Sequence, residues 1–206
     1  LLGARESESE LLEPTQAGTG VARFLEKRGE GLHHLCFEIA DVDASLRQLK
    51  TAGVALLDET SREGLAGRIG FLHPRASAGV LVELATPPNG SDPDASPLRL
   101  KRVVIGSHDP KEAAGIFQRL FALPEQGMND GPRTMLSVGR GALLLVPADE
   151  VGGLEGMVAL SLVAEDYDAV SARLLDAGAA MLNGAGELTV EPKSSHGVHL
   201  HISRFD

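Results

Sequence analysis

The chain repeats part of its own sequence, and this repeat limits the folds that it can adopt. DVDASLRQLKTAGVALL (41–57) aligns with DYDAVSARLLDAGAAML (166–182) at a shift of 125 residues, with eight of 17 positions identical. With a small loop adjustment, GVLVEL (79–84) also aligns with GVHLHI (197–202). Solenoid repeats have periods of about 20–50 residues. The longer spacing found here indicates a duplicated domain.

The first copy predicts a short strand, a helix and three further strands. LHHLCFEI (32–39) is a compact apolar run that ends just before Asp41, an N-cap candidate for a helix that stops at Gly53. Strands are then expected at 54–58, 67–73 and 79–86. The expected unit is βαβββ.

The same order recurs twice in the second half of the chain. A unit at 99–147 opens with a strand and an Asp109-Pro110 helix start, and a further unit runs from about 156 to 203. Residues 1–30 hold only the end of a unit, a strand in ELLEP (10–14) and a short helix at 19–29. We therefore expect the opening strand and helix of that unit to lie upstream of Leu1.

These units predict an α+β fold in which paired βαβββ modules form cupped mixed sheets. TPPNGSDPDASP (86–97) has the composition of a linker. It separates an N-terminally incomplete domain at 1–88 from a second domain at 98–206.

Composition narrows the functional classes. A formal charge of −10 disfavours nucleic acid as a partner, because that binding depends on clustered Lys and Arg. No apolar run approaches the roughly 20 residues of a membrane helix, so no membrane partner is expected. A single cysteine, Cys36, excludes an internal disulfide framework and is typical of a reducing compartment, which predicts a cytoplasmic protein.

Two polar residues of the first unit are predicted to face the same way. Side chains alternate along a strand, so Leu35 and Phe37 face the helix while His34 faces away from it. The same alternation turns Glu83 to the face of His34. A carboxylate among apolar neighbours needs a partner. A divalent cation is one explanation, and a surface Glu beside a hydrogen-bonded core His is the other.

Residues 6–88 resemble the methylmalonyl-CoA epimerases of the vicinal oxygen chelate (glyoxalase-like) superfamily. The resemblance rests on ELLEP, on GLHH before a strand, on FLHP before a Gly-Val loop, and on VEL. It implies a divalent metal (Co, Mn, Zn or Ni) held by Glu10, His34 and Glu83. The family's fourth ligand, a His, and one of its two acid/base carboxylates belong to the strand and helix that this chain lacks.

The second domain departs from this pattern. In the alignment of the two copies, His34 corresponds to Ala159, Glu10 to Leu143 and Glu83 to His201. The position of the family's His ligand on the opening strand corresponds to Arg102. Ala and Leu do not bind cations, so we expect 98–206 to be a degenerate domain without the metal site.

The resemblance implies an isomerase that interconverts (R)- and (S)-methylmalonyl-CoA by removing the proton alpha to the thioester. Glu83 is the expected catalytic residue, the substrate is an acyl-CoA, and the pairing of superfamily sheets leaves a homodimer open. Two alternatives stay open: another metalloenzyme of the superfamily, such as a glyoxalase-type isomerase or a dioxygenase, and a non-catalytic small-molecule-binding or dimerisation protein.

Overall fold

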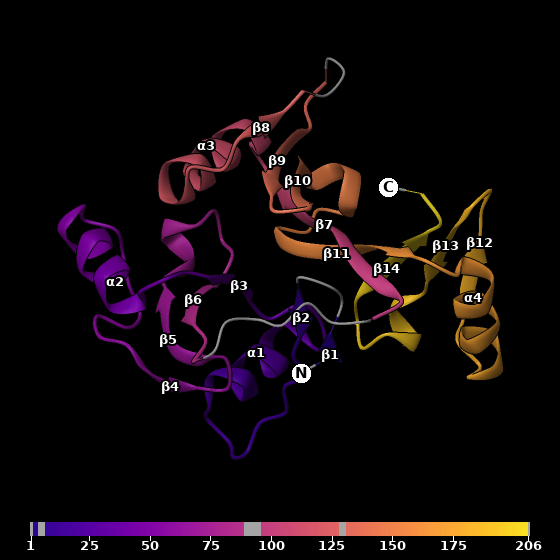
Figure 1. Cartoon of the computed structure of the whole chain (residues 1–206), viewed down its shortest axis with the longest axis horizontal. Helices are drawn as coiled ribbons and strands as arrows, with labels where there is room; N and C mark the ends of the chain where they lie inside the picture. The colour runs from indigo at the N-terminus through magenta and orange to yellow at the C-terminus, as the bar shows by residue number, and fades with distance from the viewer. Residues whose placement is uncertain (1, 4–6, 89–95, 128–130, 206) are drawn as a thin grey trace.

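The computed structural model describes residues 2–3, 7–88, 96–127 and 131–205, which form two main sheets and a small hairpin (Figure 1). The four-stranded sheet has the order β3-β6-β5-β4, and the eight-stranded sheet has the order β12-β13-β14-β11-β7-β10-β9-β8. The strands are β1 Leu2–Gly3, β2 Glu8–Ser9, β3 Leu35–Glu38, β4 Arg62–Gly64, β5 Gly67–Leu72, β6 Val82–Thr86, β7 Leu98–Ser107, β8 Glu125–Gln126, β9 Thr134–Val138, β10 Gly141–Pro147, β11 Gly156–Ala164, β12 Met181–Asn183, β13 Glu187–Val190 and β14 His199–Ser203. The helices are α1 Gly20–Arg28, α2 Val42–Thr51, α3 Pro110–Phe121 and α4 Tyr167–Asp176, with 3₁₀ turns at Pro74–Ala76, Ala148–Val151 and Pro192–Ser194.

The helices begin where the sequence predicts. The side chains of Asp41 and Asp109 accept hydrogen bonds from the backbone N–H groups of Ala44 and Glu112, which caps α2 and α3. Thr19 caps α1 in the same way. The expected α+β fold with mixed sheets is confirmed.

The repeat is also a repeat of backbone geometry. In the first unit Leu35 pairs with Val82 in a parallel ladder, and at shifts of 125 and 118 residues Leu160 pairs with Leu200. The turn before each closing strand takes positive φ at two consecutive residues. They are Ala78 and Gly79, at 52° and 81°, and His196 and Gly197, at 49° and 78°.

Three local expectations are wrong. Residues 54–58 do not form a strand but make one isolated bridge, from Leu56 to Leu72. ELLEP (10–14) is irregular, and only the two residues before it pair, with β1. A strand needs a neighbour for its backbone hydrogen bonds, and residues 10–14 have no ladder partner within the described chain. The alignment of Glu10 with Leu143 also fails, because Leu143 is buried on the helix side of its sheet.

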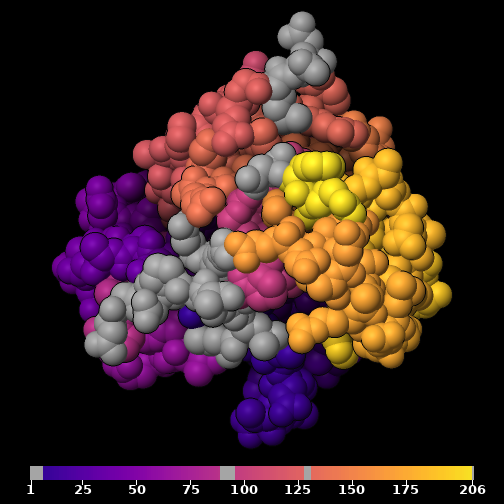
Figure 2. Space-filling model, turned by 45° about the vertical axis from the view of Figure 1, so that its right-hand side comes forward, coloured from indigo at the N-terminus to yellow at the C-terminus, as the bar shows by residue number. Residues whose placement is uncertain are grey.

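The N-terminal segment (indigo) protrudes at the bottom of Figure 2. Within it the side chain of Leu11 is 78% exposed. Of the predicted linker, residues 89–95 lie outside the described residues.

One hydrophobic core joins the two halves of the chain. It contains Leu46 of α2 and Val82 of β6 together with Ile105 of β7 and Phe117 of α3. The Phe37 and Phe121 rings, from β3 and α3, lie 4.5 Å apart between centroids. The sheet of the first unit is therefore covered by its own helix and by α3, which comes from the second half of the chain. No helix in the described part of the chain is long and apolar enough to cross a membrane.

This packing predicts a matched pair of stability effects. Leu46 is 1% exposed and packs over Gly70, whereas Leu57 is 53% exposed. Leu46→Ala should lower the free energy of unfolding by about 2–5 kcal/mol, and Leu57→Ala should change it by less than about 0.5 kcal/mol. Urea unfolding followed by circular dichroism measures both, and equal effects of the two variants would contradict the assigned core.

Candidate active site

Three side chains converge on the face of the β3-β6-β5-β4 sheet that points away from α2, which we call the cup face. Cys36 of β3 pairs with Glu83 in the parallel ladder, and the side chain of His34, just before β3, reaches Glu83 on this face. The His34 Nε2 atom lies 3.2 Å from Glu83 Oε2 and 3.9 Å from Glu10 Oε2. The structure thus brings together the three residues that the resemblance named.

The convergence is sheltered from solvent. The side chains of Glu83, His34 and Glu10 are 6%, 11% and 19% exposed. Phe71 pairs with Glu83 across β5 and β6, and its ring meets the edge of His34 at 5.6 Å between centroids. Low solvent access strengthens charge interactions among these groups.

Sequence reasoning missed the role of His33. Its Nδ1 lies 3.0 Å from Nδ1 of His34, and its ring packs edge-on against Phe24 of α1. Strand alternation placed His33 on the opposite face, but β3 begins only at Leu35, so alternation does not apply to residues 33 and 34. Burial, together with the nearby charge of His34, lowers the pKa of His33, while Glu83 acts in the opposite direction.

The contact between the two imidazoles links their protonation, because one ring has to donate and the other has to accept. One proton lies between the two Nδ1 atoms. If the lone pair of His34 Nε2 is to accept a cation, His34 carries its proton on Nδ1 and donates it to His33 Nδ1. His33 is thus suited to orient His34 for ligation.

Cys36 is the remaining reactive group on the cup face. Although the residue is exposed overall, desolvation of the thiol and the negative charge of Glu83 raise its pKa. A neutral thiol is a poor nucleophile and a poor metal ligand. The chemistry of this face therefore rests on the carboxylates and the imidazole.

One imidazole and two carboxylates are suitable ligands for a divalent cation. Whether all three can bind the same ion depends on the position of Glu10. Within the described residues, no group of three or more His, Cys, Asp or Glu side chains already has the arrangement of a metal site. Donors on a cation with bonds of about 2.1 Å lie about 3 Å apart, so the His34–Glu83 pair is close enough. Glu10 has to approach by about 1 Å.

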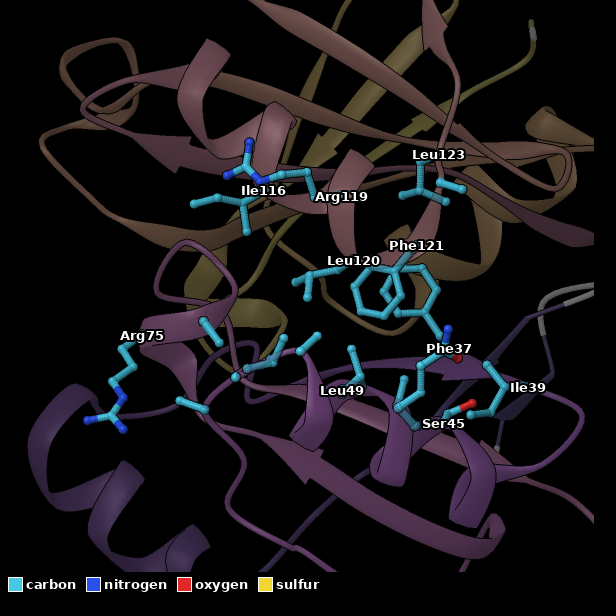
Figure 3. Close-up of a pocket in the computed structure, with 18 of the residues that line it drawn as sticks. Phe37, Ile39, Ser45, Leu49, Arg75, Ile116, Arg119, Leu120, Phe121 and Leu123 are labelled. Atoms are coloured by element: carbon cyan, nitrogen blue, oxygen red, sulfur yellow. The ribbon is translucent and has the colours of Figure 1, made fainter.

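A cavity of about 1080 Å³ lies elsewhere, between α2 and α3 (Figure 3). Phe37, Leu49 and Arg75 line it from the first unit, and Leu120 and Phe121 line it from α3. None of Glu10, His34 or Glu83 contributes to its walls. Because Phe37 and Leu84 of this cavity lie on the helix side of the sheet, the cavity and the converging donors occupy opposite faces.

Comparison with known proteins agrees with this geometry over the first part of the chain. Residues 2–72 match the family model of the Glyoxalase/Bleomycin resistance protein/Dioxygenase superfamily. The uncharacterized protein YqjC of Bacillus subtilis is 44% identical over 79 residues, which cover 38% of this chain and 56% of the relative. Ethylmalonyl-CoA/methylmalonyl-CoA epimerase of Cereibacter sphaeroides is 42% identical over 78 residues, which cover 36% of this chain and 58% of the relative. The chain thus spans little more than half of each of these relatives.

A solved structure extends the likeness of fold to nearly the whole chain. A mutant of 4-hydroxymandelate synthase from Streptomyces coelicolor superposes with a TM-score of 0.65 over 91% of this chain and 75% of that chain, at 16% identity. Identity this low speaks for the fold alone. Residues 2–72 are therefore similar to this superfamily in sequence, and nearly the whole chain is similar to the synthase in fold.

Proposed function

We propose that this protein is a metal-dependent epimerase that interconverts the (R) and (S) forms of methylmalonyl-CoA. The observation that carries the proposal is the convergence of His34, Glu83 and Glu10 on one sheltered face, within a segment 42% identical to an epimerase named for this substrate. Its cofactor would be a divalent metal, and Co, Mn, Zn and Ni all suit a donor set of one imidazole and two carboxylates.

The proposed substrate has an acidified proton, because its C2 carbon lies between a thioester and a carboxylate. A divalent cation, when bound, supplies Lewis-acid stabilisation of negative charge. Glu10, His34 and Glu83 would hold that cation, and His33 would keep His34 in the binding tautomer. Glu83 is the proposed catalytic residue: besides binding the cation, its carboxylate would take part in moving the C2 proton.

The edge of the small sheet supports a homodimer as part of this proposal. In the described chain β3 pairs with β6 on one side and has no strand on the other. An open edge next to the site is suited to pairing with a strand of a second copy.

Metal binding should depend on the converging side chains. Glu83→Ala and His34→Ala each remove one donor, so the affinity for Co²⁺ measured by isothermal titration calorimetry should fall by more than about tenfold. Glu38→Ala, which removes an exposed carboxylate from β3, is the matched control and should bind Co²⁺ as tightly as the unmodified protein does. Equal binding by all four proteins would refute the ligand assignment.

Proton exchange tests the chemistry directly. Incubation with methylmalonyl-CoA in heavy water should introduce deuterium at C2, and Glu83→Gln should slow this exchange by about 10²–10⁴-fold, because the amide neither ligates well nor accepts the proton. Mass spectrometry of the recovered thioester measures the exchange. Tight metal binding without any exchange would instead point to another superfamily metalloenzyme, and the absence of both to a non-catalytic role.

A further inference from the structure

A row of polar side chains crosses the eight-stranded sheet on the face opposite to core residues such as Val103 and Ile105, which we call its cup face. Thr189 pairs with His201 across β13 and β14, His201 with Ser161 across β14 and β11, and Ser161 with Arg102 across β11 and β7. Residues directly opposite each other on neighbouring strands share a face, so four adjacent strands each contribute one side chain to this row. All four are partly buried.

The row occupies the place that the converging donors hold in the first unit. The repeat aligns Glu83 with His201 and Cys36 with Ser161, and the observed pairing of Ser161 with His201 repeats that of Cys36 with Glu83. His34 is replaced by the small Ala159. A position that is acidic in the first unit is thus an imidazole here, with a guanidinium two strands away on β7.

A bulge adds a second cation next to Arg102. The pairing of β7 with β11 shifts register between Ser161 and Leu162, so that Lys101 is an extra residue between the partners Arg102 and Leu100. Lys101 Nζ donates a hydrogen bond to the backbone oxygen of Phe205 at 2.7 Å. Burial first, and then the charge of Arg102, lower the pKa of Lys101, while the charge of Glu187 acts in the opposite direction. Positive charges therefore lie close together on this strand, with one carboxylate near enough to act on Lys101.

The guanidinium of Arg102 has neither a hydrogen bond nor an ion pair among the described residues. The acidic group in this region is Glu187, whose Oε1 lies 3.6 Å from Nδ1 of His201, at the other end of the row. Thr189 Oγ1 contacts the same ring nitrogen at 3.1 Å, which leaves His201 Nε2 free of both contacts. A partly buried guanidinium without a partner is costly, and a charge-assisted hydrogen bond to an oxyanion would offset this cost.

We propose that the second domain binds a small oxyanion, a carboxylate or a phosphate group, on this face through Arg102, with Ser161 and His201 as neighbouring polar contacts. The Arg102 guanidinium would donate two parallel hydrogen bonds to the ligand oxygens in a bidentate ion pair. The Ser161 hydroxyl would donate a further hydrogen bond to one of these oxygens. Glu187 repels an anion at the far end of the row, so the ligand charge would sit at the Arg102 end. The site is independent of the proposed metal and does not rest on the epimerase proposal.

Calorimetric titration of the whole chain with sodium phosphate and, separately, sodium malonate tests this site. At least one anion should bind, and Arg102→Gln should weaken that binding by about tenfold or more, as expected for loss of a hydrogen-bonded charge. Lys111→Ala, which removes an exposed cation from α3, controls for net charge and should leave the affinity unchanged. Arg102→Lys keeps the positive charge but loses the two parallel N–H donors of the guanidinium, so its affinity for the anion should be intermediate.

The two titrations also separate the two sources of an oxyanion. If only malonate binds in an Arg102-dependent way, the ligand group is a carboxylate. If only phosphate does, the ligand group is a phosphate. In NMR spectra, the amide resonances of Ser161 and His201 should change their chemical shifts when the binding anion is added. The proposal is overturned if neither anion binds, if Arg102→Gln or Arg102→Lys binds both as tightly as the unmodified chain does, or if the shifts map to other strands. Thermal unfolding without anion identifies a variant that has lost its fold.

Discussion

The parallel pairing of the first and last strands of each unit is the constraint on which the rest of the structure depends. β3 lies against β6, β7 against β10, and β11 against β14. Each pair joins residues 40 to 47 positions apart in sequence, and the helix and remaining strands between them form the crossover that parallel strands require. Because of this pairing, His34 and Glu83 become neighbours although 48 residues separate them in the chain.

The same pairing divides each sheet into two chemically different faces. Val82 and Leu84 face the helices and join the common core, whereas Glu83 between them faces the cup and is 4% exposed. A carboxyl group so sheltered needs a polar partner. In the structure that partner is His34, and His34 is in turn held by His33 and Phe71. The packing of apolar residues on the helix side of the sheet thus fixes the strands that carry the polar side chains of the site.

Duplication has given the chain two cups with opposite electrostatic character. In the first, two carboxylates surround an imidazole and favour a cation. In the second, Arg102, Lys101 and His201 stand on the corresponding face, within a chain whose formal charge is −10. Since the parallel pairing of the opening and closing strands matches in the two units, the difference in charge comes mainly from the side chains, as expected where one fold carries different sites.

The sequence by itself determined the unit order and the helix caps at Asp41 and Asp109, because these depend on local periodicity and on capping chemistry. It failed for residues 10–14 and 54–58, whose strand character depends on partners that local pattern does not reveal. Only the tertiary structure decided that His33 supports His34, that α3 covers the sheet of the first unit, and that a bulge sets Lys101 beside Arg102. These features arise from contacts between segments distant in sequence, where packing and register, rather than the preferences of single residues, select the neighbours.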